Sequence, residues 1–291
     1  MDFIKIEEVI KRLQKLYPEA VVTEEVIAKN NGLSRHGIGF KTNEQERFTK
    51  IIYVDKFSDD LSVDEVVKGI IEAINNSNAS AELFDNIQNF EDVKSHLTVE
   101  LINKESNAAA LNELIYSDLL DLALIPVLFY TLPDKTRVTV KINKKVAESW
   151  GVSEKCVMET AMKNMVDERA NIMNFPGVFE RLGFQGMEEF PSIPFYILTN
   201  QSFYMGAAKM ADEAVLEDIC ITLESDLIII PSSIHECIVI ATNMLSEENP
   251  LTPEEVNSLI TSVNSSSVAA DEVLSNHAYI YKNGEGLAIW E

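Results

Sequence analysis

The chain is 291 residues long and carries 24 basic against 47 acidic residues, a formal net charge of −23. With 46% hydrophobic residues it can bury a substantial core, which excludes wholesale disorder. A protein that neutralises nucleic-acid phosphates needs a basic surface, and the few Lys and Arg residues are not concentrated in one place. We therefore expect no direct nucleic-acid partner.

The cysteines and the apolar runs indicate the cellular compartment of the protein. Cys156, Cys220 and Cys237 form neither a disulfide framework nor a CxxC motif, so we expect a reduced cytoplasmic location. The first 20 residues alternate charged and apolar residues at helical spacing and lack the apolar stretch of a signal peptide. The apolar run 122–132 is 11 residues, whereas a membrane span needs about 20. We expect no membrane segment.

The first third of the chain predicts helices and strands in mixed order. The expected elements are a helix at 4–17, strands at 20–28, 37–40 and 50–54, and a helix from 62 to 75. An Asn30-Asn31-Gly32 turn separates the first two strands. Ser62 and Glu65 have the spacing of a capping box. Residues 90–105 fit a helix and a strand equally well.

The middle of the chain predicts a hairpin followed by two helices. Residues 119–130 and 137–142 read as paired strands around Pro133-Asp134. Asn143 is expected to cap a short helix that ends at Trp150-Gly151, and Ser153 a second helix with a methionine-rich core stripe. Prolines and glycines within 170–194 predict a linker or mobile segment.

The last third again mixes the two kinds of element. We expect strands at 195–198, 206–209, 227–230, 237–241 and 278–281, and helices at 212–221 and 252–263. Thr252 and Glu255 form a second capping box, with Pro253 at the first helical position. Because strands and helices do not alternate strictly, the fold class is α+β, with mixed or antiparallel sheets. We expect two lobes, 1–170 and an acidic 195–291, joined by 171–194.

The negative charge is concentrated towards the C-terminus. From Met210 to Tyr281 there is no Lys or Arg, yet there are 13 Asp and Glu residues. A solvated acidic surface that aids solubility explains this, as does a docking face for a basic protein surface. Divalent-metal binding is a third explanation, although no DxDxDG calcium loop is present, and we predict neither a metal site nor a cofactor. The predicted docking residues are Asp212, Glu213, Glu217, Asp218, Glu247, Glu248, Glu254 and Glu255.

One polar cluster offers side chains for catalysis. No phosphate loop, GxSxG elbow or HExxH motif occurs, but Ser232, Ser233, His235 and Glu236 stand together between two apolar runs. His235 could deprotonate a serine, with an acid orienting the ring. Adjacent residues of a strand point to opposite faces, however, so Glu236 is poorly placed for that task. A turn whose hydroxyls bond backbone amides explains the same residues.

Several fragments spread over the chain form one pattern. They are Asn30-Asn31-Gly32, His36-Gly37-Ile38, Ile52-Tyr53-Val54-Asp55, Trp150-Gly151-Val152-Ser153-Glu154, Leu198-Thr199-Asn200, Gly206-Ala207-Ala208, Pro231-Ser232-Ser233-Ile234-His235-Glu236 and Glu272-Val273-Leu274-Ser275. Together they resemble a family of bacterial cytoplasmic proteins classified only as a domain of unknown function, common in gut Clostridia and distantly similar to YtpQ-like proteins. The resemblance implies a shared fold and carries no activity.

Three functions follow as expectations. The first is a non-catalytic binding or regulatory protein that docks a basic macromolecule through its acidic C-terminal lobe. A special case of it is an inhibitor that mimics nucleic-acid charge, as mobile-element proteins do. The second is a hydrolase or small-ligand enzyme centred on the Ser232–Glu236 cluster. The third is a structural subunit of a homo-oligomer.

Overall fold

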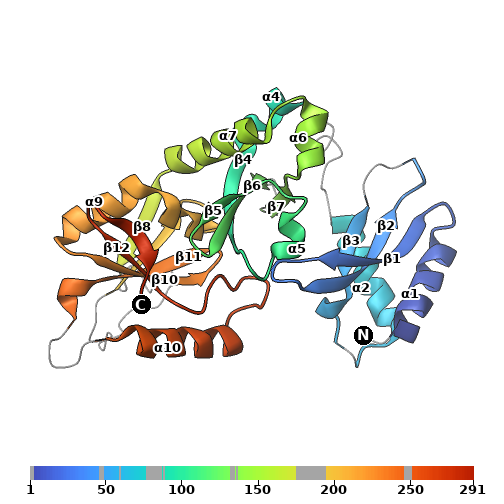
Figure 1. Ribbon diagram of the computed structural model, residues 1–291. Coiled ribbons are helices and arrows are strands. Elements are labelled where there is room, and N and C mark those ends of the chain that lie inside the picture. The colour runs from blue at the N-terminus through green and yellow to red at the C-terminus, as the bar shows by residue number, and fades with distance from the viewer. Residues whose placement is uncertain are drawn as a thin grey trace. The chain divides into compact units, whose positions relative to one another are not determined.

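The computed structural model describes residues 3–45, 49–58, 60–76, 87, 89–131, 135, 137–174, 195–245 and 251–291. Its strands form antiparallel sheets with helices packed against them, which confirms the α+β class. Contacts divide the chain into unit 1, Met1–Ile87, and unit 2, Gln88–Glu291. Figure 1 shows the helices and strands of each unit.

Unit 1 is a three-stranded sheet packed against two helices. Its elements are α1 (Phe3–Leu16), β1 (Val21–Ala28), β2 (Ser34–Lys41), β3 (Lys50–Tyr53), the 3-10 helix η1 (Val54–Lys56) and α2 (Val63–Asn76). The strand order is β1-β2-β3. Val9 and Leu13 of α1, Val66 and Ile70 of α2 and Ile38 of β2 belong to one buried core. The helices and strands predicted for this part of the chain are confirmed.

Two sheets build unit 2. The first part contains α4 (Phe90–Val93), η3 (Lys94–His96), β4 (Leu97–Asn103), α5 (Ala108–Leu111), β5 (Ser117–Leu119), β6 (Leu122–Thr131), β7 (Arg137–Lys141), α6 (Lys144–Trp150) and α7 (Glu154–Asp167). The second part contains β8 (Ala170–Asn174), β9 (Tyr196–Asn200), η4 (Gly206–Ala211), α9 (Glu213–Leu223), β10 (Leu227–Ser233), β11 (Glu236–Ala241), η5 (Thr242–Met244), α10 (Pro253–Ser266), β12 (Tyr279–Lys282) and β13 (Gly286–Ile289).

The larger sheet is covered on both faces. Its order is β13-β12-β10-β11-β9-β8, and all of its pairings are antiparallel. Ile228 and Ile240 lie opposite each other on β10 and β11 and pack with Val256 and Ile260 of α10. On the other face η4 contacts β9, β10 and β11, and α9 follows η4 directly. The smaller sheet, β4-β6-β5 with β7 paired to β6, carries α7 on β4 and β6.

The helix ends follow the predicted capping chemistry. Asn143 and Ser153 accept backbone N–H donors at the starts of α6 and α7, at 2.9 and 3.2 Å. Thr252 and Glu255 form the reciprocal capping box of α10. In the methionine-rich stripe of α7, Val157, Ala161 and Met165 are buried, and Met158 and Met162 are half-buried.

Two parts of the sequence reading differ from the structure. The strand predicted at 206–209 is wrong, because these residues form the 3-10 helix η4. A run of small apolar side chains fits a tight turn as well as a strand, and a Cβ on Gly206 would lie 2.7 Å from His235 O. The contact division falls at residue 87 instead of within 171–194, since β8 and β9 pair in one sheet. Residues 175–194, most of the expected linker, lie outside the described residues.

Candidate functional site

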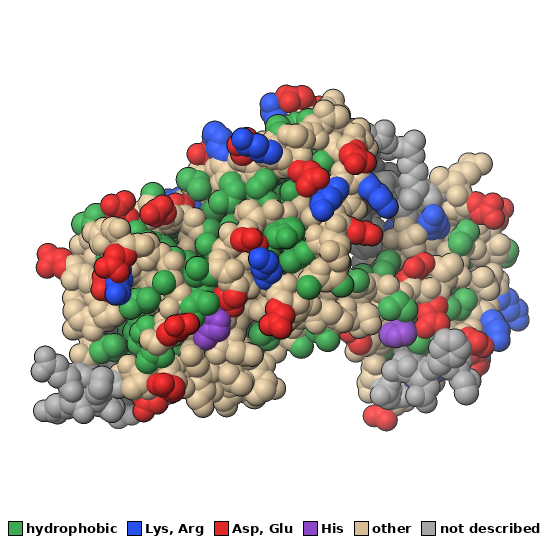
Figure 2. Space-filling view, viewed as in Figure 1, with side chains coloured by type: hydrophobic (Ala, Val, Ile, Leu, Met, Phe, Trp, Pro, Cys, Tyr) green, Lys and Arg blue, Asp and Glu red, His purple; other side chains and the backbone are tan. Residues whose placement is uncertain are grey.

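The helix α9 turns its acidic residues towards solvent. Asp212 caps its N-terminus by accepting the Val215 N–H at 3.4 Å. Leu216, Ile219 and Cys220 are buried, and this inner face fixes which residues point outward. Glu213, Glu217 and Asp218 are exposed on the opposite face. In Figure 2 several acidic side chains lie on the surface over α9, at the left of the view, among hydrophobic and other side chains.

The cation nearest to these acids in the sequence is withdrawn into the core. Lys209 and Asp212 are 1% and 3% exposed, and Lys209 Nζ lies 3.2 Å from Asp212 Oδ2. The same ammonium group donates to the carbonyl oxygen of Met165 at 2.5 Å and to that of Glu168. All three donor hydrogens of the ammonium group therefore have partners inside the protein. Lys209 neutralises Asp212 and is not available to the exposed acids of α9.

This arrangement corrects the prediction for Asp212. The sequence placed it among the outward docking acids, but it is a buried helix cap and ion-pair partner. A buried carboxylate needs a cation or several hydrogen bonds, and Asp212 has both. Lys209, three residues earlier in the sequence, could have indicated this ion pair, since residues at that spacing face each other across one helical turn.

The remaining predicted acids have different surroundings. Glu254 is exposed in the first turn of α10. Glu255 is exposed too, but its carboxylate accepts from the Thr252 N–H at 3.1 Å. Glu247 and Glu248 lie outside the described residues. Within the described part of the chain, no ion pair involves Glu213, Glu217 or Asp218.

The charges of α9 affect a neighbouring tyrosine. The pKa of the Tyr281 phenol is raised, first by burial and then by the negative charges of Glu213 and Glu217. A raised pKa is the direction expected when carboxylates disfavour another anion close to them. Two acids of this face thus act together as a local negative field.

The imidazole of His235 is held in place by the backbone. His235 Nδ1 accepts the Met205 N–H at 3.1 Å, so the proton of the neutral ring is on Nε2. That nitrogen lies 3.5 Å from Glu272 Oε1. The Tyr204 ring packs on the imidazole, with centroids 4.9 Å apart. The carboxylate near His235 is therefore Glu272, from a distant part of the sequence.

Ser232 and Ser233 end β10 and Glu236 begins β11, so Ile234 and His235 form the connection between the two strands. Ser233 Oγ accepts the backbone N–H of His235 at 3.1 Å, and Thr199 Oγ1 donates to His235 O at 2.8 Å. The Ser233 hydroxyl thus bonds the backbone at this turn. No serine–imidazole hydrogen bond occurs among the described contacts of His235. Glu236, the first residue of β11, is partly exposed.

A second polar group connects the two sheets of unit 2. Asp121, between β5 and β6, accepts a hydrogen bond from the Tyr279 hydroxyl at 2.7 Å and lies 3.0 Å from His277 Nε2. Burial raises the pKa of the Tyr279 phenol, and the hydrogen bond to Asp121 raises it further. Sequence spacing could not reveal this group, because more than 150 residues separate Asp121 from His277 and Tyr279.

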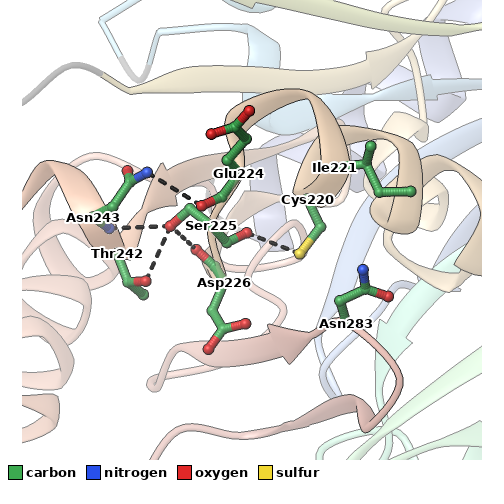
Figure 3. A pocket seen from close by; sticks show the side chains of 8 residues that line it. All are labelled: Cys220, Ile221, Glu224, Ser225, Asp226, Thr242, Asn243 and Asn283. Carbon is green, nitrogen blue, oxygen red and sulfur yellow. Dashed lines mark hydrogen bonds between the residues drawn. The ribbon is translucent and has the colours of Figure 1, made fainter.

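A hollow of about 490 Å³ lies at the C-terminal end of α9. Figure 3 shows its lining, in which Glu224 and Asp226 lie on either side of the Ser225 side chain. Cys220 donates from Sγ to Ser225 O at 2.8 Å, and burial raises the pKa of its thiol. No local pattern predicts this hollow, because η5 brings Thr242 and Asn243 to it from the far end of β11.

Unit 1 contains a smaller charged hollow of about 280 Å³. His36 Nδ1 lies 3.2 Å from Glu24 Oε1, and Arg35 Nε lies 3.5 Å from Asp55 Oδ2. Arg35 and Asp55 form an ion pair there, whereas the contact of His36 with Glu24 is an ion pair only when the imidazole is protonated. Among the described residues of both units, no group of three His, Cys, Asp or Glu side chains could hold a metal ion.

Comparison with known families places the chain. The sequence model of a family of unknown function, DUF5688, matches residues 3–283. The chain belongs to the DUF5688 family. Neither the curated proteins nor the solved structures contain a significant match to it. In the described part of this DUF5688 chain, no helix has both the length and the apolar character that crossing a membrane requires.

Proposed function

We propose that this DUF5688 protein is a non-catalytic binding protein that docks a basic macromolecular partner through the exposed acids of α9. The observation that supports the proposal is the burial of Lys209 with Asp212, beside an outer face on which Glu213, Glu217 and Asp218 are exposed. The stretch that follows Lys209 carries no Lys or Arg as far as Tyr281. Because no ion pair of these three acids occurs in the described part of the chain, we propose that positive charge reaches this face from solution ions or from another molecule.

The strength of such docking depends on salt. Exposed charges are screened over about 8 Å at physiological ionic strength. Carboxylates grouped on one helix face raise the rate at which a basic surface is captured and select against acidic surfaces. The Tyr281 phenol already feels the combined charge of two of these acids. A partner with a Lys- or Arg-rich surface fits this face.

The environment of His235 supports binding over hydrolysis. A general base that activates serine must accept the hydroxyl proton, and His235 Nδ1 already accepts the Met205 N–H.

The nucleic-acid mimic is a special case of the docking proposal, in which DNA or RNA competes for the same partner. We also propose a cytoplasmic bacterial setting and a distant relationship to YtpQ-like proteins, on the residues that carry the resemblance.

Charge neutralisation on α9 tests the proposal. A labelled oligolysine peptide is titrated into the wild-type protein and into the variant Glu213→Gln/Glu217→Gln/Asp218→Asn at low salt. We expect the variant to bind roughly tenfold more weakly, since three exposed charges at about 0.5 kcal/mol each sum to that factor.

A matched variant controls for net charge. Glu105→Gln/Glu113→Gln/Glu148→Gln removes three exposed acids of unit 2 that lie away from α9 in the sequence. It should keep the wild-type affinity. Equal weakening of both variants would show that the peptide responds to total charge alone, and the docking face would be abandoned.

A further inference from the structure

The turn between β9 and η4 contains two residues with strained backbone. Phe203 and Met205 have φ angles of 53° and 57°, in the left-handed region that residues with a side chain seldom adopt. Residues held in this region persist only where the surrounding contacts fix them, and they are common at switch regions. The segment 200–205, which we call the strained turn, therefore depends on its hydrogen bonds.

Amide, hydroxyl and guanidinium groups form several of these bonds. Asn200 Nδ2 donates to Tyr204 O at 3.0 Å, and Asn200 Oδ1 accepts from Ser202 Oγ at 3.0 Å. Arg137 Nη2 donates to Ser202 O at 3.0 Å. None of these side-chain groups gains or loses a proton between about pH 5 and pH 8. These bonds therefore hold the strained turn equally well throughout that range.

The bond between Met205 and His235 differs from them. Met205 is 3% exposed, and its N–H donates to His235 Nδ1 at 3.1 Å. An imidazole accepts a hydrogen bond only while it is neutral, because both ring nitrogens carry hydrogen once it is protonated. Rotating the ring does not restore the bond, since neither nitrogen then has a lone pair to offer. Protonation of His235 therefore takes this acceptor away from the Met205 N–H.

The surroundings of His235 contain both signs of charge. The charged and titratable groups that adjoin it, or face it across the Tyr204 ring, are Glu236, Glu272, Tyr204, Arg137 of β7 and Glu100 of β4. Burial, and then the charge of Glu100, raises the pKa of the Tyr204 phenol, so this side chain stays neutral. Glu272 is the carboxylate that lies near the imidazole, 3.5 Å from Nε2.

Two effects of protonation oppose each other. Glu272 favours the charged imidazole, but its side chain is 38% exposed, so water screens the attraction. The Met205 N–H is buried, and a buried donor without an acceptor loses its hydration with no compensation. The second effect is the larger one, and protonation of His235 disfavours the strained turn.

The strained turn also connects the two sheets of unit 2. Met205 shares a buried core with Ile102 of β4 and Ile125 of β6, in the smaller sheet. The Tyr204 ring stacks on Phe129 of β6, with centroids 5.4 Å apart. The backbone of the same turn is bound by His235, which lies between β10 and β11 of the larger sheet. Movement of this turn therefore changes the packing between the sheets.

We propose that the strained turn is a pH-dependent switch, closed while His235 is neutral and opened when His235 is protonated, so that acid loosens the contact between the two sheets of unit 2. This switch is independent of docking through α9, because neither its contacts nor its test involves the acids of that helix.

Amide hydrogen exchange in the full chain, followed by NMR, tests the switch. Protection factors, which correct for the intrinsic effect of pH on exchange, are measured for Met205 and Ile229 between about pH 5 and pH 8. Ile229 is buried at the centre of the larger sheet, between β11 and β12. We expect the protection of Met205 to fall roughly tenfold at the acid end, while that of Ile229 is unchanged. An equal fall at both residues would show general acid destabilisation and would overturn the switch.

Three variants assign the effect to one histidine. His235→Asn keeps an oxygen that can accept the Met205 N–H and cannot be protonated in this range, so the protection of Met205 should not depend on pH. Glu272→Gln removes the carboxylate that favours the charged imidazole, so the fall should move to lower pH. His277→Asn removes a histidine bound to Asp121 and is the control, in which the fall should be unchanged.

Three results would contradict the proposal. The first is a fall in Met205 protection that persists in His235→Asn. The second is a fall at the same pH in Glu272→Gln as in the wild type. The third is a fall that disappears in His277→Asn, which would assign the pH dependence to the other histidine.

Discussion

The ion pair between Lys209 and Asp212 makes a quantitative prediction about unit 2. Replacing Lys209 with Met keeps an unbranched side chain but leaves the buried Asp212 carboxylate and two carbonyl oxygens without their donor. Removing one partner of a buried pair lowers the free energy of unfolding by about 3–5 kcal/mol, and that free energy is only about 5–15 kcal/mol for a typical domain. We expect Lys209→Met to lower the free energy of unfolding by that amount.

A double-mutant cycle separates the pair from the rest of the site. Asp212→Asn keeps an oxygen that can cap α9 and removes the charge. If the pair is coupled, the double variant Lys209→Met/Asp212→Asn loses less stability than the two single losses added together, by at least about 1.5 kcal/mol. Lys155→Met, at an exposed pair with Glu159, is the control and should cost under about 1 kcal/mol.

The chain offers a selective probe for this experiment. Both of its tryptophans, Trp150 and Trp290, belong to unit 2. Urea unfolding followed by tryptophan fluorescence therefore reports on the unit that contains the pair. A loss below about 1 kcal/mol in Lys209→Met would refute the argument, because Lys209 would then be solvated and free to neutralise the α9 acids.

Three further predictions concern stability. Gly206→Ala should lower the free energy of unfolding by about 3 kcal/mol or prevent folding, since its Cβ would lie 2.6 Å from Asn200 N. Gly151→Ala would meet no atom within 4 Å and should lower it by only about 1 kcal/mol, as measured by thermal unfolding. Thr252→Ala should lose about 1 kcal/mol in urea unfolding by removing the capping box of α10, and an unchanged midpoint would speak against the box. His235→Asn should be about 1 kcal/mol more stable than His235→Gln, because the Asn oxygen can replace Nδ1 as acceptor of the backbone N–H; the reverse order would show that this hydrogen bond is unimportant.

Local patterns predicted much of the fold. Capping residues such as Asn143 and Ser153 act within one helical turn, so sequence spacing alone locates them. Alternation and apolar runs placed β10 and β11, whose pairing sets Ile228 opposite Ile240. The segment 206–209 was misread because a short apolar run does not distinguish a strand from a 3-10 helix. The strand β13, which pairs with β12, was not predicted.

The candidate site was harder to predict than the fold. Exposure of Glu213 and Glu217 follows from helical periodicity once α9 is recognised. The burial of Asp212 depends on carbonyl groups of α7 and the segment after it, which no local pattern connects to η4. The hollow at the C-terminal end of α9 is lined by residues between 220 and 283 that the fold brings together. Composition indicated the sign of the charge, and tertiary structure decided which carboxylates face outward.

The most direct test of the docking proposal is the salt dependence of oligolysine binding, compared between the wild-type protein and Glu213→Gln/Glu217→Gln/Asp218→Asn. Binding through exposed carboxylates weakens as salt screens them, and fewer carboxylates give a smaller dependence. We expect the logarithm of Kd to rise steeply with the logarithm of salt concentration for the wild type and less steeply for the variant. Identical slopes and affinities for the two proteins would contradict docking through α9.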